Sequence, residues 1–254
     1  MAALRLEARR PIDPPADDGF GVSYVPDDGA ERRVPLAQAW AVPLEQGSPV
    51  RRFRSRKGQR HLSGLWWSAT TGGHVGFESW LERDHLLHLD FDPSVVGIAS
   101  QPFWLHWTDA AGKPVAHAPD FFARRSDGTA VVIDCRPVER RRPRDVAKFD
   151  ATARACALAG WEYRLLGAAD ALVTANLRWL AGYRHPRHQL PETVDVLRHV
   201  FATPTPLMSG AEVAGDPIAV VPVLFHLLWC HELTLDLSTP VHQATLVSPP
   251  VGQR

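Results

Sequence analysis

The chain has 254 residues, enough for one large or two modest domains, and its 28 basic and 28 acidic side chains give a formal net charge of zero. No apolar run is long enough to span a bilayer, and the first residues lack the apolar core of a signal peptide, so we expect a cytoplasmic protein without membrane contact. The three cysteines form no CxxC pair, which argues against a disulfide framework and a structural zinc site.

The N-terminal part, residues 1–47, is rich in proline and aspartate and short of apolar runs, so we expect a partly ordered extension. A basic cluster follows between residues 51 and 60. Lysine and arginine side chains neutralise phosphates, and we take Arg56, Lys57 and Arg60 from this cluster as candidate DNA contacts. The alternative is a solvated loop, which accounts for many runs of arginine.

An amphipathic helix is predicted over residues 76–89, where apolar residues recur at helical spacing. Glu78 and Glu82 lie four residues apart and therefore project from the same side of this helix. We interpret Glu78 as a candidate metal ligand because it opens the helix beside the apolar core. Glu82 is interpreted as a solvated partner of Arg83 or Arg60.

Strands dominate the next part of the chain. One or two strands are predicted over residues 95–107, broken at Pro102. Two further apolar segments, 118–123 and 130–136, are predicted to form neighbouring strands joined by the turn at 126–129.

This predicted pair of strands carries the most informative residues, Asp120 and the triplet Asp134-Cys135-Arg136. Because side chains alternate along a strand, Asp134 and Arg136 share a face and Cys135 lies on the other. Carboxylates at the ends of apolar strands are costly to bury without a partner, which suggests a shared cation. His117, three residues before Asp120, is interpreted as a structural hydrogen-bond partner rather than a metal ligand.

Such a set of side chains suits phosphodiester hydrolysis. Two carboxylates can hold a hard ion such as Mg²⁺, which polarises the phosphate and activates water. Arg136 can stabilise the charge that develops on the phosphoryl oxygens, but it cannot act as a base. The alternative is a β-hairpin whose aspartates are caps or surface charges, because the pattern of P-D followed by D-x-R also occurs by chance.

A second basic cluster follows this candidate site. We take five of its side chains as candidate DNA contacts: Arg140, Arg141, Arg142, Arg144 and Lys148. A helix is predicted from residue 144 to 159 and ends at Gly160, so Arg144 and Lys148 are one turn apart. Either could supply the catalytic cation in place of Arg136. A strand at 161–166 and a helix at 169–180 complete this region.

The chain changes character near residue 185, and from Val200 onward its only basic residue other than histidine is Arg254. Helices are predicted over residues 190–201, 209–213 and 218–230, the second with Ser209 as its N-cap and the third with Pro217 at its start. Strands are predicted at 232–237 and 242–247. Three helices and a hairpin give a small winged-helix-like domain. Its acidic composition favours protein contact over DNA contact.

Several motifs together resemble one known family. They are Arg56-Lys57-Gly58-Gln59-Arg60-His61, Gly64-Leu65-Trp66-Trp67-Ser68, the helix start at Phe77-Glu78-Ser79-Trp80-Leu81-Glu82-Arg83-Asp84, His117-Ala118-Pro119-Asp120-Phe121-Phe122 and Val132-Ile133-Asp134-Cys135-Arg136-Pro137. In this order they resemble the TnsA-like endonuclease subunits of heteromeric transposases, over about residues 50–185. The resemblance implies a PD-(D/E)XK endonuclease core, a mixed sheet flanked by helices, with Mg²⁺ as cofactor and Mn²⁺ as a substitute.

The resemblance also assigns roles in the site. It implies that Glu78, Asp120 and Asp134 are the catalytic and metal-binding acids and that Arg136 stands in the basic place. The better-studied members carry lysine there, and often glutamine two residues earlier, so this chain departs from the family pattern at both positions.

The implied function is a DNA endonuclease that cuts one strand at transposon ends. Its implied partners are double-stranded DNA, a DDE-type transposase subunit and an AAA+ regulator, the last contacted by the winged-helix-like domain. The expected domains are the extension at 1–47, the endonuclease domain at 48–185 and the winged-helix-like domain at 186–254. Two alternatives stay open: a stand-alone PD-(D/E)XK nuclease of a defence or restriction system, and a non-enzymatic adaptor with a lapsed site.

Overall fold

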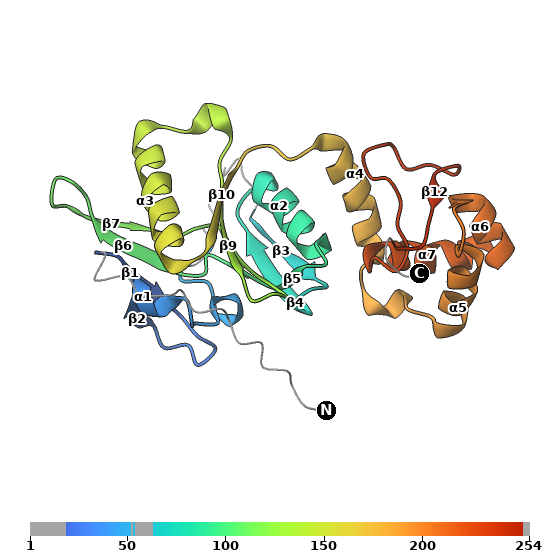
Figure 1. The fold of residues 1–254 in the computed structure, drawn as a ribbon, viewed down its shortest axis with the longest axis horizontal. Helices are drawn as coiled ribbons and strands as arrows, with labels where there is room; N and C mark the ends of the chain where they lie inside the picture. Colours follow the sequence, from blue (N-terminus) through green and yellow to red (C-terminus); the bar gives the residue numbers. More distant parts are fainter. Residues whose placement is uncertain (1–18, 52, 54–62, 251–254) are drawn as a thin grey trace. The chain divides into compact units, whose positions relative to one another are not determined.

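A computed structural model describes residues 19–51, 53 and 63–250 (Figure 1). The chain divides into two compact units, residues 1–169 and 170–254. The helix at 171–180, which the sequence analysis placed in the endonuclease domain, therefore groups with the second unit. The first unit mixes helices with several sheets, as expected for a nuclease-like fold.

The first unit contains most of the strands. Its elements in chain order are β1 (Gly21–Tyr24), β2 (Arg32–Pro35), α1 (Leu36–Ala39), η1 (Leu44–Gln46), β3 (Gly64–Ser68), β4 (Gly73–Phe77), α2 (Trp80–Phe91), β5 (Val95–Ser100), β6 (Trp104–Thr108), β7 (Pro114–His117), β8 (Phe121–Arg125), β9 (Ala130–Cys135), η2 (Val138–Arg140), α3 (Pro143–Ala159) and β10 (Glu162–Leu166).

The central sheet has the strand order β10-β9-β8-β5 and carries the candidate site where its two inner strands meet, at the start of β8 and the end of β9. β8 and β9 form the antiparallel pair that the sequence predicts, with Phe121 opposite Ile133. β10 runs parallel to β9. Both faces of this sheet are covered, since Val132 of β9 packs in one apolar cluster and Val131 and Ile133 pack in another. That double burial explains why β9 reads as a continuous apolar run.

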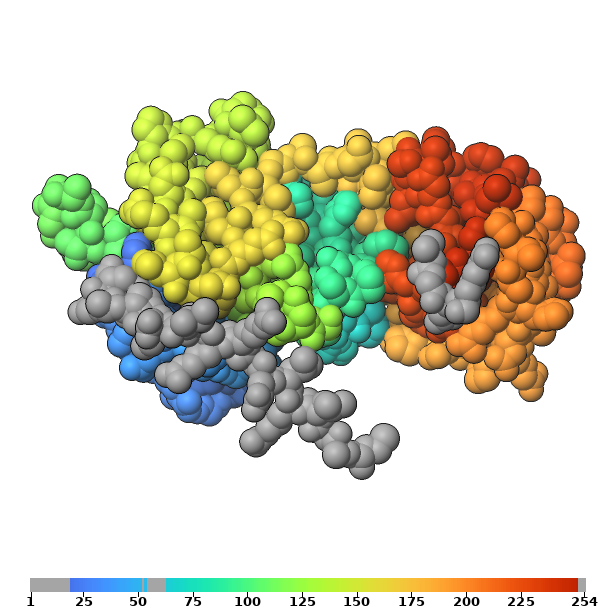
Figure 2. Space-filling model, viewed as in Figure 1, coloured from blue at the N-terminus to red at the C-terminus, as the bar shows by residue number. Residues whose placement is uncertain are grey.

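A second sheet has the order β2-β1-β6-β7 and is antiparallel throughout. The predicted break at Pro102 is confirmed, because β5 and β6 belong to different sheets. The backbone turns at Gln101, whose φ is 47°. The tip of the β6–β7 hairpin, drawn in green, projects from the first unit in both views (Figures 1 and 2).

The two long helices of this unit begin and end where local signals place them. α2 begins after Ser79, whose side-chain oxygen accepts a hydrogen bond from the Glu82 backbone N–H group. α3 has Pro143 in its first turn and ends at Gly160, which adopts the left-handed conformation with φ of 72°. α2 packs Leu86 into the apolar cluster that contains Ile133.

The second unit is mainly helical. Its elements are α4 (Ala171–Leu180), η3 (Ala181–Tyr183), η4 (Pro186–His188), α5 (Pro191–Val200), β11 (Thr205–Pro206), α6 (Leu207–Ala214), α7 (Pro217–Trp229) and β12 (Leu246–Val247). Pro217 starts α7 as predicted, but α6 begins two residues before Ser209, so the predicted N-cap is wrong. Among the described helices none alone could cross a membrane; α6 and α7 pass the length and hydropathy test only as a pair bent by 120°.

The hairpin predicted for residues 232–247 is not formed, so the winged-helix arrangement is not confirmed. β12 pairs instead with β11, and Thr234 makes only an isolated bridge to Ser248. Side chains satisfy the backbone groups that a strand partner would have paired. Asn176 donates to the carbonyl oxygens of Leu237 and Thr239, at 2.9 and 2.8 Å.

Candidate active site

One pocket of about 270 Å³ in the first unit collects the predicted site residues. Helix α2, strands β7 and β9, the start of β8 and helix α3 contribute its lining. The lining residues are Arg51, Glu78, Glu82, His117, Asp120, Asp134, Cys135, Arg136, Asp145, Lys148 and Phe149. All four predicted catalytic residues are therefore brought together, with Lys148 as a further cation beside them.

Asp120 lies directly before β8, where its backbone N–H group donates to the Ile133 carbonyl at 3.0 Å. Its Oδ2 atom accepts a hydrogen bond from the Cys135 backbone N–H group at 2.7 Å. Burial raises the pKa of Asp120 well above its usual range, and the charges of Glu82 and Asp134 raise it further. Burial and the two neighbouring carboxylates therefore disfavour the charged form of Asp120.

Asp134 is almost fully buried, with 2% of its surface exposed, and two side chains hold it. His117 Nε2 lies 2.9 and 3.0 Å from its two carboxylate oxygens, and the Tyr163 hydroxyl donates to Oδ2 at 2.8 Å. The Phe149 ring meets the His117 ring edge-on, with centroids 5.9 Å apart. Burial raises the pKa of Tyr163, as does the nearby charge of Asp134, so this hydroxyl stays protonated and acts as the donor in its hydrogen bond to Asp134. The hydrogen-bonding role predicted for His117 is confirmed.

The two glutamates of the α2 region have different surroundings. Arg51 holds Glu78 through two hydrogen bonds, Nη1 to Oε1 at 3.0 Å and Nη2 to Oε2 at 2.6 Å. Glu82 accepts from the Glu78 backbone N–H group at 2.7 Å and from the Ser79 hydroxyl at 2.8 Å. Burial raises the pKa of Glu82, while these hydrogen bonds lower it. The charge of Glu82 is also one of those that raise the pKa of Asp120.

Glu82 is therefore not the solvated partner of Arg83 that the sequence analysis expects. Arg83 pairs with Asp84 at 2.9 Å, and its guanidinium lies over the Trp80 ring, 4.1 Å from the ring centroid. Arg60, the other expected partner, lies outside the described residues. Of Glu82 in α2 and Glu78 just before it, Glu82 is the one whose charge raises the pKa of Asp120.

Besides Arg51, two cationic side chains line the pocket, Arg136 and Lys148. Arg136 Nη2 donates to Asp145 of α3 at 3.1 Å, while Arg136 Nε is buried and has no hydrogen-bond partner among the described atoms. Lys148 is half-buried one turn further along α3. Across residues 19–51, 53 and 63–250, no carboxylate lies within 4 Å of the Lys148 ammonium group. The partly exposed guanidinium of Arg136 and the ammonium of Lys148 are groups in this pocket that suit a phosphate oxygen.

The alternation predicted along β9 is confirmed. Val131, Ile133 and Cys135 pack toward one apolar cluster, whereas Val132 packs into the other. Asp134 lies on the Val132 face, where Tyr163 of β10 reaches it. Burial raises the pKa of Cys135, and the charges of Asp120 and Glu82 raise it further. The thiol therefore stays protonated.

The acids form no ready-made metal cage. Within the described part of the chain, no group of three His, Cys, Asp or Glu side chains is arranged to hold a metal ion. Each acid instead accepts hydrogen bonds from neighbouring donors. The side chains that could bind a metal are carboxylates, and the pKa of two of them, Asp120 and Glu82, is raised. Carboxylate oxygens suit a hard divalent cation.

The predicted DNA contacts differ in their exposure to solvent. Arg56, Lys57 and Arg60 lie outside the described residues. Arg140, Arg142 and Arg144 are exposed on η2 and at the start of α3. Arg141 donates instead to the backbone carbonyls of Arg136 and Leu165, at 3.3 and 3.5 Å, so its guanidinium links β9 to β10.

Residues 92–167 match the family model described as the TnsA-like endonuclease N-terminal domain. A search of the curated proteins found no match to the chain. The matched segment runs from just before β5 through β10 and so contains Asp120, Asp134 and Arg136, but it begins after the two α2 glutamates. This match supports a TnsA-like nuclease of the PD-(D/E)XK superfamily, as the motifs of the sequence indicate.

Proposed function

We propose that this protein is a metal-dependent DNA endonuclease that cuts one strand at transposon ends, in a complex with a DDE-type transposase and an AAA+ regulator. One observation carries the proposal: Asp120, Asp134 and Arg136, which all belong to the matched segment, line a single pocket. The proposed cofactor is Mg²⁺, with Mn²⁺ as a substitute. Its substrate and partners follow from the family of the domain.

Asp120 and Asp134 are the proposed metal ligands, and an α2 glutamate is the third. The structure favours Glu82 for this third place, because its charge acts on Asp120 while Arg51 neutralises Glu78. A bound Mg²⁺ supplies Lewis-acid activation of the phosphate and of the attacking water.

The remaining pocket residues position these ligands and the substrate. His117 and Tyr163 fix the orientation of the Asp134 carboxylate through hydrogen bonds. The Arg136 guanidinium, whose side chain is 42% exposed, and the Lys148 ammonium group donate to the non-bridging phosphate oxygens, where negative charge develops during hydrolysis. Arg136 cannot take up a proton from water, so its part is electrostatic.

The second unit is the proposed contact for the protein partners. Val213 and Ile218, at the end of α6 and the start of α7, are 74% and 86% exposed. From Val200 to Cys230 the sequence has no lysine or arginine, which disfavours phosphate contact. Exposed apolar side chains without basic neighbours suit a protein surface.

The proposal is tested by incubating the protein with labelled transposon-end DNA and Mg²⁺, with and without a candidate DDE-type transposase and AAA+ ATPase. We expect a cut in one strand at the transposon end that requires both Mg²⁺ and the transposase. Cleavage of any DNA without these partners would instead support a stand-alone nuclease. No cleavage under any condition would support a lapsed site.

A further inference from the structure

Arg51 lines the candidate active site, and the proposed reaction gives it no contact with the substrate. Glu78 accepts two hydrogen bonds from Arg51, at 3.0 Å from Nη1 and at 2.6 Å from Nη2. Burial raises the pKa of Asp120 and of Glu82, and the charge of Arg51 opposes this effect in both carboxyl groups. The guanidinium therefore lies close enough to two proposed metal ligands to act on their charge.

The backbone holds Arg51 beside Asp120. The Val50 N–H group donates to the Gln101 carbonyl at 3.0 Å, and the Gln101 N–H group donates to the Asp120 carbonyl at 2.9 Å. Gln101 makes these two bonds with a φ of 47°, in the left-handed region that is unfavourable for a residue with a β-carbon. The strained turn therefore lies where the chain links residue 50 to Asp120. The place of Arg51 in the pocket is set by these backbone contacts as well as by Glu78.

Arg51 keeps hydrogen-bond donors for a further acceptor. A guanidinium has five N–H groups, and Glu78 accepts from two of them. Within residues 19–51, 53 and 63–250, the structure gives Arg51 no other hydrogen bond or ion pair. Its side chain is 29% exposed, and its Nε atom, unlike that of Arg136, is not buried. Arginine pairs strongly with phosphate through charge-assisted hydrogen bonds of this kind.

Arg136 is held at the pocket in a similar way. Its Nη2 atom donates to Asp145 at 3.1 Å, and its side chain is 42% exposed. Neither Asp145 nor Glu78 is among the acids that the structure favours as metal ligands. Each pocket arginine is therefore oriented by a carboxylate that leaves the proposed metal ligands unoccupied. Partly exposed ion pairs of this kind are weak, so a phosphate can share or take over the guanidinium.

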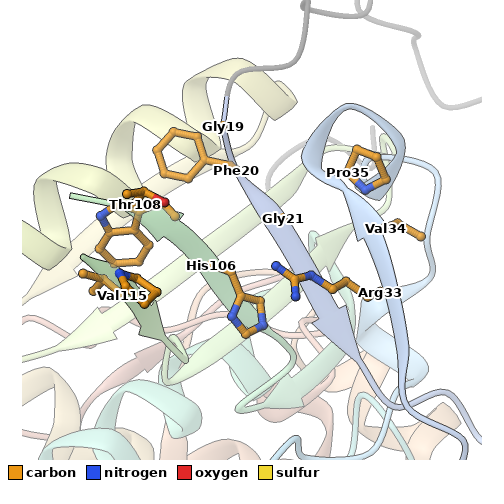
Figure 3. Close-up of a pocket in the computed structure, with 11 residues that line it drawn as sticks. Gly19, Phe20, Gly21, Arg33, Val34, Pro35, His106, Thr108 and Val115 are labelled. Atoms are coloured by element: carbon orange, nitrogen blue, oxygen red, sulfur yellow. The ribbon is translucent and has the colours of Figure 1, made fainter. Parts of the chain in front are cut away.

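A larger hollow of the first unit lacks such a convergence of groups. It has a volume of about 520 Å³ and lies at the sheet β2-β1-β6-β7, where Figure 3 shows Arg33 reaching toward His106. The strand registers put Arg33 and His106 on one face of this sheet. Phe20 and Trp107, which also line the hollow, pack against the apolar cluster on the other face. The groups of this hollow do not meet at one ligand, whereas Arg51 shares its pocket with the proposed metal ligands.

We propose that Arg51 binds a phosphate of the DNA strand that enters the candidate active site, through the N–H groups that Glu78 leaves free, and that Glu78 orients Arg51 for this contact. This inference rests on the proposed function in taking DNA as the substrate. The alternative is a structural ion pair that only ties residue 51 to the start of α2.

The test measures binding without cleavage. Fluorescence anisotropy in EDTA gives the Kd of the full-length protein for a fluorescein-labelled hairpin duplex at several salt concentrations. Arg51→Gln should reduce the magnitude of the slope of log K against log salt by about 0.9, the value for one lost phosphate contact. At about 0.1 M salt the corresponding loss of affinity is about eightfold. Arg51→Lys should keep the slope, because the ammonium group still pairs with the phosphate.

Two control variants separate this contact from a structural role. Glu78→Gln breaks the same ion pair and should leave the slope unchanged, because Arg51 keeps its charge. The thermal unfolding temperatures of Glu78→Gln and Arg51→Gln should fall by similar amounts, since both variants lose the same pair. Arg83→Gln removes an arginine that also pairs with a carboxylate, Asp84 at 2.9 Å, but does not line the pocket, and it should leave the slope unchanged.

The inference is overturned if Arg51→Gln leaves the salt slope unchanged. It is also overturned if Glu78→Gln lowers the slope equally, which would indicate a structural ion pair, or if Arg83→Gln does so, which would indicate a general effect of charge. If the wild-type protein binds no DNA, the proposed function fails and the inference fails with it. Because the assay contains no metal, a result against Arg51 alone leaves the proposal of metal-dependent cleavage standing.

Discussion

The choice between Glu82 and Glu78 as the third acid gives the sharpest prediction about the active site. Glu82→Gln removes a charge that acts on Asp120 but leaves an amide oxygen to accept from the Glu78 backbone N–H group. The cost to folding is then limited to part of a helix-capping interaction, about 0.5–1 kcal/mol. Loss of a metal ligand should cost about 2.7 kcal/mol or more of transition-state stabilisation, which is about a hundredfold in rate.

Glu78→Gln is the matched control. It breaks the ion pair with Arg51, whose side chain is 29% exposed against 19% for Glu78. A partly exposed pair of this kind contributes about 1 kcal/mol or less to stability, and cleavage should stay within about tenfold of the wild type. Both variants carry the same chemical change on the same region of the chain.

The assay is single-turnover cleavage of labelled DNA with Mg²⁺, with the thermal unfolding temperature as the check on folding. A second readout needs no activity: carboxyl NMR titration in EDTA should show the pKa of Asp120 lowered in Glu82→Gln, because one of the charges that raise it has gone. If Glu78→Gln abolishes cleavage while Glu82→Gln cleaves normally, the reasoning is wrong and the ligand lies at Glu78, as the sequence analysis expects.

Three further predictions concern neighbouring groups. Burial raises the folded-state pKa of Asp120, so above the usual aspartate range the folded protein binds more protons than the unfolded chain. In EDTA the free energy of unfolding should therefore fall as pH rises from about 4 through the raised pKa. Asp120→Asn should flatten this pH dependence, measured by urea denaturation. Arg136→Lys should keep substantial cleavage activity, and Arg136→Met should lose most of it. If Arg136→Met cleaves normally and Lys148→Met does not, the catalytic cation comes from α3. Tyr163→Phe removes one of the two side chains that hold Asp134, so kcat should fall several-fold while KM for DNA is unchanged, and an equal change in KM would contradict a positioning role.

The parts of the fold that the sequence predicts well are those set by local signals. The β8–β9 pair follows from two apolar runs around a turn, and α3 ends at Gly160 because that residue reaches the left-handed region at low cost. The pairing of Asp120 with Asp134 follows from the same hairpin. Alternation along β9 is likewise a local property of an extended strand.

What the sequence does not predict depends on contacts between distant residues. Arg51 and Glu78 are 27 residues apart, and Tyr163 reaches Asp134 only because β10 lies parallel to β9 in a particular register. The predicted strand at 232–237 has suitable alternation but is not formed; Asn176, 61 residues before Leu237, donates to the Leu237 carbonyl instead of a strand partner. Because the sequence does not show these contacts, it favours Glu78 as the metal ligand and Glu82 as a solvated side chain.

The central claim is that the pocket around Asp120 hydrolyses DNA with a divalent metal. The most direct measurement compares wild-type protein and Asp120→Ala on transposon-end DNA, each with Mg²⁺ and with EDTA, in the presence of the transposase. We predict strand cleavage only for the wild type with Mg²⁺, with Asp120→Ala folded and reduced by orders of magnitude in rate. Full cleavage by folded Asp120→Ala at ordinary Mg²⁺, or equal wild-type cleavage in EDTA, would contradict the account.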